Sequence, residues 1–311
     1  MVVGLDIGGT KTAVLVVDQA MNILSRYTSR TEVADPQLFL ESIISAIRCS
    51  LEIAGQSTGD IRAIGVGLPG RVIPETGEVA SAVNLNLDQF PIGDALAASY
   101  NVPVIVENDV RAAAVGLYEQ KFKQQAINHM AYLSIGTGIS AGIVLNGTLY
   151  RGASGMAGEI GHVMFQPEGR RCLCGAHGCL EALASGPAIA QQWHEKKHHS
   201  FSGELTAKHV FEAANTGEPA ATKIIKQAGK HIARAIQMLI MLYDVDTVVL
   251  GGGVTGAGRA FLDPVLSALS RIRSESKLAK EMLPESKVEM LPYGTDAPTL
   301  GAVKLALQAV T

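Results

Sequence analysis

The sequence lacks the features that mark several classes of protein. It contains no stretch of about 20 apolar residues, the length that a membrane-spanning helix needs, so we expect no membrane partner. Residues 1–18 are apolar, but Asp6, two glycines and Lys11 interrupt them, which argues against a signal peptide and favours a cytoplasmic protein. Lys and Arg number 26 against 29 Asp and Glu, without a basic run, so nucleic acid is not an expected partner.

The composition also argues against a disordered chain, and the sequence contains no low-complexity linker. Charged residues make up only 18% of the chain and hydrophobic residues 47%, which is typical of a well-packed enzyme. The 311 residues are enough for two modest domains, at roughly 100–200 residues each. Because no low-complexity linker separates the halves, we expect two packed lobes.

The residue pattern predicts an α/β architecture. Runs of β-branched and apolar residues bounded by glycines predict strands at residues 2–6, 12–17, 61–67, 102–107, 247–250 and 287–291. Apolar spacing of three and four predicts helices at 36–54, 111–125 and 220–243, a further helix after residue 253 and a closing helix. The first two strands form a β-hairpin, and the segment after residue 67 is rich in turn residues.

The opening hairpin has a second copy later in the chain. When residues 134–146 are aligned on residues 6–18, Ile135, Gly136, Ala141 and Val144 fall on identical residues. Both copies have the order strand, glycine turn, strand. We interpret this as an internal duplication, in which each half presents a glycine hairpin.

The glycines of residues 4–12 resemble a P-loop without completing it. The lysine of that motif should directly follow Gly9, where Thr10 stands, and the segment runs into a strand instead of a helix. Its backbone N–H groups would therefore meet phosphate from a hairpin turn, as an anion nest. The residues alone are also compatible with an ordinary glycine hairpin that binds no phosphate.

The sequence contains two Gly-x-Gly-x-x-Gly matches, which differ in how well their surroundings suit a nucleotide-binding site. The match at residues 65–70 contains Pro69 and runs into further turn residues, so it lacks the helix that a dinucleotide site requires. The match at residues 251–256 lies between a predicted strand and helix and could approach a nucleotide. It does not fit NAD, because the charged, helical residues 271–281 stand where a strand ending in an acid should follow.

Three cysteines and one histidine have the spacing of a metal site. His162 is followed by Cys172, Cys174 and Cys179, and glycines between them allow the chain to bend. Four such ligands close a tetrahedron around Zn²⁺ and leave no open position, which favours a structural zinc over free buried cysteines. His177 could compete as a ligand. We expect Cys49 in the core, and His194, His198 and His199 in solvent.

Together these motifs resemble the ROK family of bacterial sugar kinases and repressors, over essentially the whole chain. The first phosphate motif of the family is similar to residues 6–11 (DIGGTK), and the second to residues 135–138 (IGTG). Its sugar and zinc signature is similar to residues 159–162 (EIGH) and 172–181 (CLCGAHGCLE). Residues 251–253 resemble the adenosine-side motif, and residues 107–109 the segment with the catalytic aspartate.

The resemblance implies a two-lobed, actin-like ATPase (ribonuclease H-like) α/β fold of duplicated domains with a cleft between them. It implies an N-terminal lobe at residues 1–118, on which a C-terminal helix at about 299–311 packs back. The C-terminal lobe, with the zinc loop and the nucleotide motifs, would span residues 119–298. A homodimer or homotetramer is also implied.

The resemblance also assigns roles to the motif residues. Asp109 is the general base, at the kind of strand end where open α/β sheets place their sites, although capping of the next helix would also explain an aspartate there. Asp6 lies near Mg²⁺ and the phosphates of ATP. The implied sugar contacts are Asn84, Asn108, Asp109, Glu159, His162 and Glu181. The implied ATP contacts are Asp6, Gly8, Gly9, Thr10, Lys11, Thr12, Gly136, Thr137, Gly138, Gly251, Gly252 and Gly253.

His162 would connect the metal with the sugar. If one ring nitrogen of His162 binds Zn²⁺, the other nitrogen is held as an N–H donor. The metal would then fix both the tautomer and the direction of a sugar contact.

These assignments predict an ATP-dependent kinase of a hexose or N-acylhexosamine, a phosphotransferase with an alcohol group as acceptor. Glucose, N-acetylglucosamine and N-acetylmannosamine stay open, because residues 84–88 (NLNLD) lack the Trp that follows Asn-Leu in family glucokinases. A sugar-sensing repressor would need a helix-turn-helix before Asp6, for which the preceding residues leave no room. A polyphosphate-dependent glucokinase and a zinc-stabilised dehydrogenase are two further functions that compete with this prediction.

Overall fold

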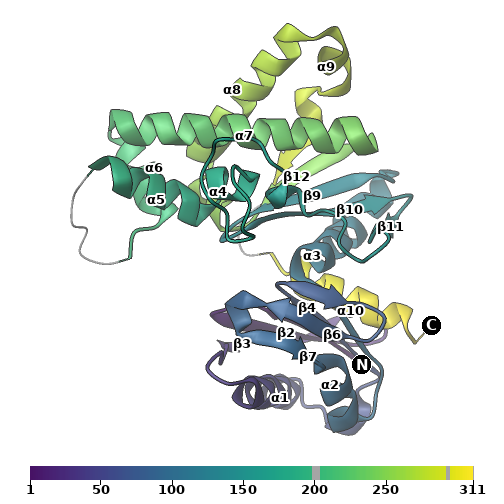
Figure 1. Ribbon diagram of the computed structural model, residues 1–311. Helices are drawn as coiled ribbons and strands as arrows, with labels where there is room; N and C mark the ends of the chain where they lie inside the picture. The colour runs from purple at the N-terminus through teal and green to yellow at the C-terminus, as the bar shows by residue number, and fades with distance from the viewer. Residues whose placement is uncertain (198–203, 292–294, 311) are drawn as a thin grey trace. The chain divides into compact units, whose positions relative to one another are not determined.

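The computed structural model describes residues 1–197, 204–291 and 295–310, and the chain forms two compact units (Figure 1). The first unit consists of Met1–Asn128, Gly142–Ala157 and Asp296–Thr311, and the second of His129–Ala141 and Gly158–Thr295. These bounds differ from the predicted division at residue 118. Residues 119–128 and 142–157, predicted in the C-terminal lobe, belong to the first unit, and the hydrogen bond from the Gly147 N–H to the Asn128 carbonyl (2.9 Å) joins these two segments. Among the described helices, none is long and apolar enough to cross a bilayer.

The first unit is built on a five-stranded sheet of order β3-β2-β1-β4-β8. Its strands are β1 (Val2–Ile7), β2 (Lys11–Val17), β3 (Ile23–Arg30), β4 (Ala63–Leu68) and β8 (Val104–Asn108). β1, β4 and β8 run parallel, whereas β2 and β3 continue the sheet antiparallel. β4 is buried along its whole length, as expected for a parallel strand covered on both faces.

Helices cover both faces of this sheet (Figure 1). α1 (Pro36–Ile53) and α2 (Ile92–Tyr100) lie on one face, and α3 (Asp109–Leu117) and α10 (Ala297–Gln308) on the other. α1 starts where Asp35 accepts hydrogen bonds from two backbone N–H groups of the first turn, with Pro36 at the first helical position. Phe39, Ile43 and Ile47 are fully buried at helical spacing, and each contributes about 1.5–3 kcal/mol by leaving water.

Several short elements of the first unit were missing from the prediction. β3 was not predicted, and the segment after residue 67 forms a small sheet of β5 (Arg71–Ile73), β6 (Glu78–Ala82) and β7 (Leu87–Phe90). The helix predicted at 111–125 begins earlier, at Asp109, and its α-helical part ends at Leu117. A π-helical turn, Tyr118–Phe122, and a 3₁₀ turn, Lys123–Gln125, follow it.

The second five-stranded sheet repeats the order of the first, as β11-β10-β9-β12-β13. Its strands are β9 (Met130–Ile135), β10 (Ile139–Leu145), β11 (Thr148–Leu149), β12 (Thr247–Gly251) and β13 (Val288–Met290). β9 starts 128 residues after β1 (130 − 2), and β10 starts 128 residues after β2 (139 − 11). The predicted internal duplication is therefore confirmed.

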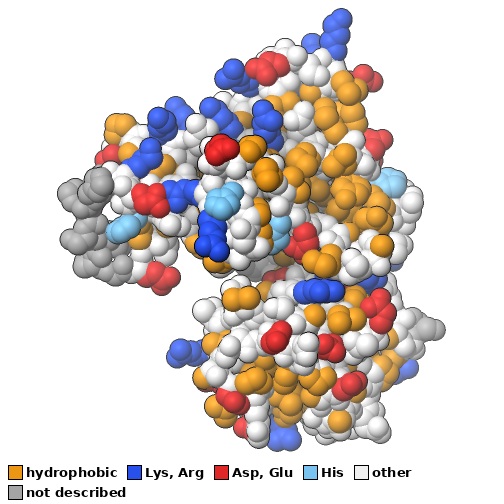
Figure 2. All heavy atoms as spheres, in the orientation of Figure 1, with side chains coloured by type: hydrophobic (Ala, Val, Ile, Leu, Met, Phe, Trp, Pro, Cys, Tyr) orange, Lys and Arg blue, Asp and Glu red, His pale blue; other side chains and the backbone are white. Residues whose placement is uncertain are grey.

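A long helix, α7 (Pro219–Tyr243), organises the second unit, close to the predicted 220–243. It packs against β12 and against the other helices, which are α4 (Leu180–Ala184), α5 (Gly186–Lys197), α6 (Ala207–Asn215), α8 (Arg259–Glu275) and α9 (Lys277–Met282). Figure 2 shows Lys and Arg side chains along α7, whose exposed positions include Lys223, Lys226, Lys230 and Arg234. Ile225 and Ile232 are buried on the opposite side, so α7 is strongly amphipathic.

Candidate active site and metal centre

The turn between β1 and β2 presents open backbone in the first unit. The Gly8 N–H donates to the Lys11 carbonyl (2.8 Å), which closes the turn, and Thr10 and Lys11 are exposed. Such a turn offers N–H groups and one cation to an anionic ligand. The buried hydroxyl oxygen of Thr12 lies 2.9 Å from that of Thr31, and the contact of Thr12 with ATP stays a prediction.

Two carboxyl groups of the first unit interact at the same edge of the sheet. Asp6 lies near the end of β1 and Asp109 directly follows β8, and these strands flank β4 in parallel. Burial, followed by the negative charge of Asp109, raises the pKa of Asp6 to about 7, against the opposing effect of Lys11. Asp6 is therefore a carboxyl group that changes its charge near neutral pH unless a cation approaches it.

Asn108 is the N-cap residue of α3, and Asp109 Oδ1 also accepts a hydrogen bond from the Val110 N–H (2.9 Å). Asn108 Oδ1 accepts hydrogen bonds from the N–H groups of Val110 (3.0 Å) and Arg111 (3.2 Å), and its Nδ2 donates to the Gly70 carbonyl (3.3 Å). Asn108 is 6% exposed and keeps little free hydrogen-bonding capacity, so its predicted sugar contact stays a proposal.

Asn84 lies beside the turn between β1 and β2. It is an exposed residue of the 3₁₀ turn Val83–Leu85, in which Leu85 is buried, and a Cβ atom added to Gly9 would come within 3.0 Å of the Asn84 carbonyl oxygen. The structure therefore brings Asn84 next to the turn of Gly8 and Gly9.

A buried ion-pair network that the sequence reasoning missed supports this edge of the sheet. Glu107 is fully buried, and its two carboxylate oxygens each lie 2.7 Å from an arginine Nε, that of Arg111 and that of Arg151. Burying a carboxylate is costly unless it is paired and hydrogen-bonded, and here both oxygens are engaged. The network joins the end of β8, the first turn of α3 and the segment after β11.

In the second unit, the turn with Glu159 and His162 lies against the start of β10. The Ala141 N–H donates to the Gly158 carbonyl (2.8 Å), and the His162 N–H donates to the Glu159 carbonyl (3.1 Å). Gly161 has to be glycine, because a Cβ atom there would overlap with the Ile139 carbonyl oxygen. Glu159 and His162 thus flank a turn that is pressed onto residues 139–141.

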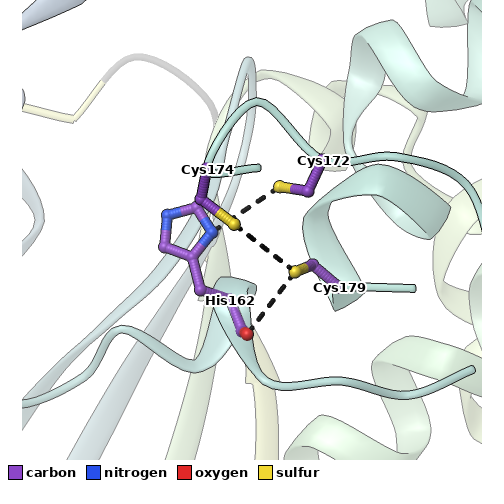
Figure 3. A group of neighbouring side chains, drawn as sticks. All are labelled: His162, Cys172, Cys174 and Cys179. Atoms are coloured by element: carbon purple, nitrogen blue, oxygen red, sulfur yellow. Dashed lines mark hydrogen bonds between the residues drawn. The ribbon is translucent and has the colours of Figure 1, made fainter. Parts of the chain in front are cut away.

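The predicted metal ligands come together (Figure 3). One ligand atom from each of His162, Cys172, Cys174 and Cys179 lies within 4.8 Å of all the others. Cys172 Sγ is 3.7 Å from His162 Nδ1, and Cys174 Sγ is 3.7 Å from Cys179 Sγ. Ligands about 2.0–2.3 Å from a tetrahedral Zn²⁺ are separated by about 3.5–3.8 Å, so the set fits zinc.

The details of the cluster separate its ligands from the neighbouring histidines. His177 is exposed and does not belong to the cluster. His162 presents Nδ1 to the cysteines, which leaves Nε2 for another partner (Figure 3). Burial raises the pKa of the Cys179 thiol to about 12 without a metal, so binding a cation there must displace a proton. His194 is exposed, whereas His198 and His199 lie outside the described residues.

The metal loop folds because of two glycines in the left-handed region. Gly175 has φ +94° and Gly178 has φ +70°, and a Cβ atom on Gly178 would overlap with the Gln166 carbonyl oxygen. The Cys172 N–H donates to the Ala176 carbonyl (2.7 Å) across the turn that contains Gly175. The sequence therefore encodes the loop geometry together with its ligands.

A cavity of about 830 Å³ in the second unit is lined by part of each of the other two glycine motifs, Gly136 and Thr137 of one and Gly253 of the other, whereas Gly138, Gly251 and Gly252 are not among its lining residues. The turn of Gly136, Thr137 and Gly138 follows β9, and the glycines at 251–253 start at the last residue of the adjacent parallel strand β12. Thr137 and Gly253 line the cavity with Phe211 and Asn215 of α6. Sequence reasoning missed both α6 residues, because Phe211 and Asn215 face the cavity only once α6 has packed.

Comparison with known proteins identifies relatives over most of the chain. The model of the ROK family matches residues 2–309. The glucokinase of Halalkalibacterium halodurans is 32% identical over 318 residues, which cover 98% of this chain and 94% of that protein. The N-acetylmannosamine kinase of Vibrio cholerae is 32% identical over 266 residues, 85% of this chain and 88% of that protein.

Solved structures of other ROK proteins have the same fold as this chain. The crystal structure of the ROK hexokinase from Thermus thermophilus is similar with a TM-score of 0.85 and 32% identity, over 99% of this chain and 98% of that one. A ROK family glucokinase from Streptomyces griseus, in complex with glucose and AMPPNP, is similar with a TM-score of 0.80 and 30% identity, over 99% of each chain.

The fold and these relatives define the class of the protein: a sugar kinase with the actin-like ATPase fold, a phosphotransferase with an alcohol group as acceptor. The chain belongs to the ROK family. The resemblance stated from the motifs and the predicted fold class are both confirmed.

Proposed function

We propose that this protein transfers the terminal phosphoryl group of ATP to a hydroxyl group of a hexose or N-acylhexosamine, with Asp109 as the general base. The observation that carries the proposal is the proximity of the carboxyl groups of Asp109 and Asp6, whose charges interact at the sheet edge next to the Gly8–Gly9 turn. Phosphoryl transfer needs little covalent chemistry from the protein beyond positioning, charge stabilisation and one oriented base.

In this proposal the two carboxylates have different tasks. Asp109 accepts the proton of the attacking sugar hydroxyl, a role for which its position at a strand end is suited. Asp6 would hold Mg²⁺, which neutralises charge on the phosphates, and the cation would favour the ionised form of Asp6. Backbone N–H groups of the Gly8–Gly9 turn and the Lys11 ammonium group bind phosphate oxygens.

The remaining ATP contacts belong to the second unit. The turns at 136–138 and 251–253 would bind the rest of the nucleotide in the 830 Å³ cavity. Phe211 and the glycine backbone supply an apolar lining of the kind that an adenine ring needs. The zinc ion would be held by His162, Cys172, Cys174 and Cys179 and would supply structural stability.

The residues proposed to bind sugar hydroxyl groups are Asn84, Asn108, Asp109, Glu159, His162 and Glu181. The acceptor is glucose, N-acetylglucosamine or N-acetylmannosamine. The glucokinase relatives favour the first and the N-acetylmannosamine kinase relatives the third. We expect a homodimer or homotetramer, which light scattering would measure.

The test is a coupled ADP-release assay with Mg-ATP over a panel of hexoses and N-acylhexosamines, run on the wild type and on Asp109→Asn. We expect one or two sugars to stimulate ADP release, and the variant to lose about 10²–10⁴-fold in kcat with a smaller change in KM. ADP release that no sugar stimulates would disprove the kinase; full kcat in Asp109→Asn would disprove only the base. Polyphosphate replaces ATP in a parallel arm to test the second possible donor.

A further inference from the structure

A short segment of the second unit, residues 179–186, contains both a metal ligand and contacts to the 136–138 turn. Cys179 belongs to the metal cluster and directly precedes α4. Two residues later, Glu181 Oε2 accepts a hydrogen bond from the Ile139 N–H (3.0 Å). At the start of α5, the Gly186 N–H donates to the Gly136 carbonyl (2.8 Å). Residues 179–186 are therefore hydrogen-bonded to the chain at both ends of the 136–138 turn.

The contact between Glu181 and the turn is tight. A Cβ atom added to Gly138 would lie 2.6 Å from Glu181 Oε2, so the carboxylate packs directly against the turn backbone. The other carboxylate oxygen, Oε1, lies 3.9 Å from Cys172 Sγ. One side chain thus lies between a metal ligand and the turn that we assign to the nucleotide.

The segment itself has little freedom to move. Leu180, Leu183 and Ser185 are buried, and the Leu180 N–H donates to the carbonyl of Val163 (3.0 Å), the residue after His162. The Ser185 N–H donates to the Glu181 carbonyl (3.1 Å) and closes the single turn of α4. A change in the position of Cys179 is therefore passed to Glu181 and Gly186 instead of being absorbed between them.

We propose that the occupied metal centre orders the 136–138 turn through residues 179–186, so that metal binding and nucleotide binding reinforce each other. This inference rests on the proposed function, in that the cluster holds zinc and the turn binds the nucleotide. Glu181, which the proposed function also assigns to the sugar, then has a second role as a positioning residue that acts through the turn.

The physical reason is the cost of ordering the loop. Without a metal, the four ligand residues are joined only by long contacts, such as those from Cys172 Sγ to His162 Nδ1 and from Cys174 Sγ to Cys179 Sγ, both at 3.7 Å. The nucleotide must then order the turn and its support at the expense of its own affinity. Because equilibrium coupling is reciprocal, a bound nucleotide must raise the affinity for zinc by the same factor.

The first experiment measures this coupling without sugar. AMPPNP is titrated by calorimetry into zinc-loaded and zinc-free protein, with far-UV circular dichroism as the check that both are folded. We expect about 5–20-fold weaker AMPPNP binding without zinc. Equal affinity of the two folded forms would overturn the proposal. If the zinc-free protein unfolds, the loaded protein gives the answer by competition with a chelator: AMPPNP should raise the apparent zinc affinity by the same factor.

Variants at Glu181 test whether the coupling between metal and nucleotide passes through this side chain. Glu181→Ala removes the acceptor for the Ile139 N–H and should abolish the coupling, whereas Glu181→Gln keeps an acceptor oxygen and should retain most of it. Glu195→Ala is the matched control, because Glu195 pairs with Arg170 of the metal loop at the surface, and its loss should leave the coupling unchanged. Full coupling in Glu181→Ala would exclude this route.

The outcomes also separate this inference from the proposed function. An enzyme that phosphorylates a sugar but shows no coupling would refute only the inference. Zinc-loaded protein that does not bind AMPPNP at all would refute both the nucleotide site and the coupling.

Discussion

The folded protein keeps the Asp6 carboxyl group buried at a cost to its own stability. Its surroundings remove water and place Asp109 nearby, and both effects disfavour the charged form. The folded protein therefore binds a proton at Asp6 up to a pH of about 7, whereas an unfolded chain releases it near 3.8. Below the lower value the two states bind this proton equally. Between the two values the folded state loses stability as the pH rises.

We expect Asp6→Asn to raise the free energy of unfolding at pH 8 by on the order of 2–4 kcal/mol without Mg²⁺, because the amide carries no charge to bury. At pH 4 the difference from the wild type should be much smaller. Urea unfolding at several pH values measures it.

The neighbouring carboxylate provides a second variant for the same measurement. Asp109→Asn removes one of the causes of the raised pKa of Asp6, so it should weaken the dependence of stability on pH between about 4 and 7. An Asp6→Asn variant with the same stability offset at pH 4 and pH 8 would contradict the assignment of a raised pKa to Asp6.

Single side chains were predictable from the sequence where a motif fixes them. The four metal ligands come together as their spacing predicts, since the loop glycines dictate a tight turn. The partners of Glu107 were not predictable, because Arg151 approaches it only through the tertiary fold. The contact of Thr12 with Thr31 was not predictable for a similar reason: Thr31 lies just beyond β3, a strand that was not predicted.

Among helices and strands, α10 makes the closest contacts of the first unit. Gly301 packs so tightly on α3 that a Cβ atom there would overlap with the Ala112 carbonyl oxygen. Gly65 of β4 has the same relation to the Ala302 carbonyl oxygen. These contacts let α10 approach β4 and α3 at backbone distance, which is possible only without side chains at these positions.

Gly301→Ala should therefore destabilise the first unit by about 1–3 kcal/mol, because the helices must separate to admit the methyl group. The matched control is Gly59→Ala, at an exposed position where a Cβ atom would have only the Ser57 hydroxyl oxygen nearby, at 3.8 Å. Chemical denaturation compares the two. A loss as small in Gly301→Ala as in the control would mean that α10 can shift freely.

The long, apolar elements were the ones that the sequence predicted well. α1, α7 and β12 agree with the prediction within one residue at each end, because burial on a wide face leaves a clear periodic pattern. β5, β6 and β7 contain only three to five residues and carry polar residues, so they leave no such pattern. The polar side chains of β3 suit its place at an edge of its sheet.

Across the whole chain, the metal centre should affect the two units unequally. Cys174→Ser removes one ligand of the cluster, which lies entirely within the second unit. We expect a lower Tm, loss of hydrogen-exchange protection in residues 160–186 and a KM for sugar raised by about 10-fold or more, because His162 loses its fixed orientation. Protection of β1 and β4 should not change.

The control for this prediction is Cys49→Ser, which alters a cysteine of α1 outside the cluster. An unchanged KM in a folded, metal-free Cys174→Ser protein would refute the link between zinc and sugar. Loss of protection in the first unit as well would show that the metal stabilises the entire chain.

The position of α10 has a consequence for biosynthesis. A ribosome releases the strands of the first unit early, yet the helix that covers β1 and β4 is made only after the entire second unit has been translated. Until then, Val2, Leu15 and Ala63, which cluster with Val303 of α10, lack their cover. Nascent chains should therefore require protection from premature association for most of the time of their synthesis, and the first unit can complete its core only at the end of translation.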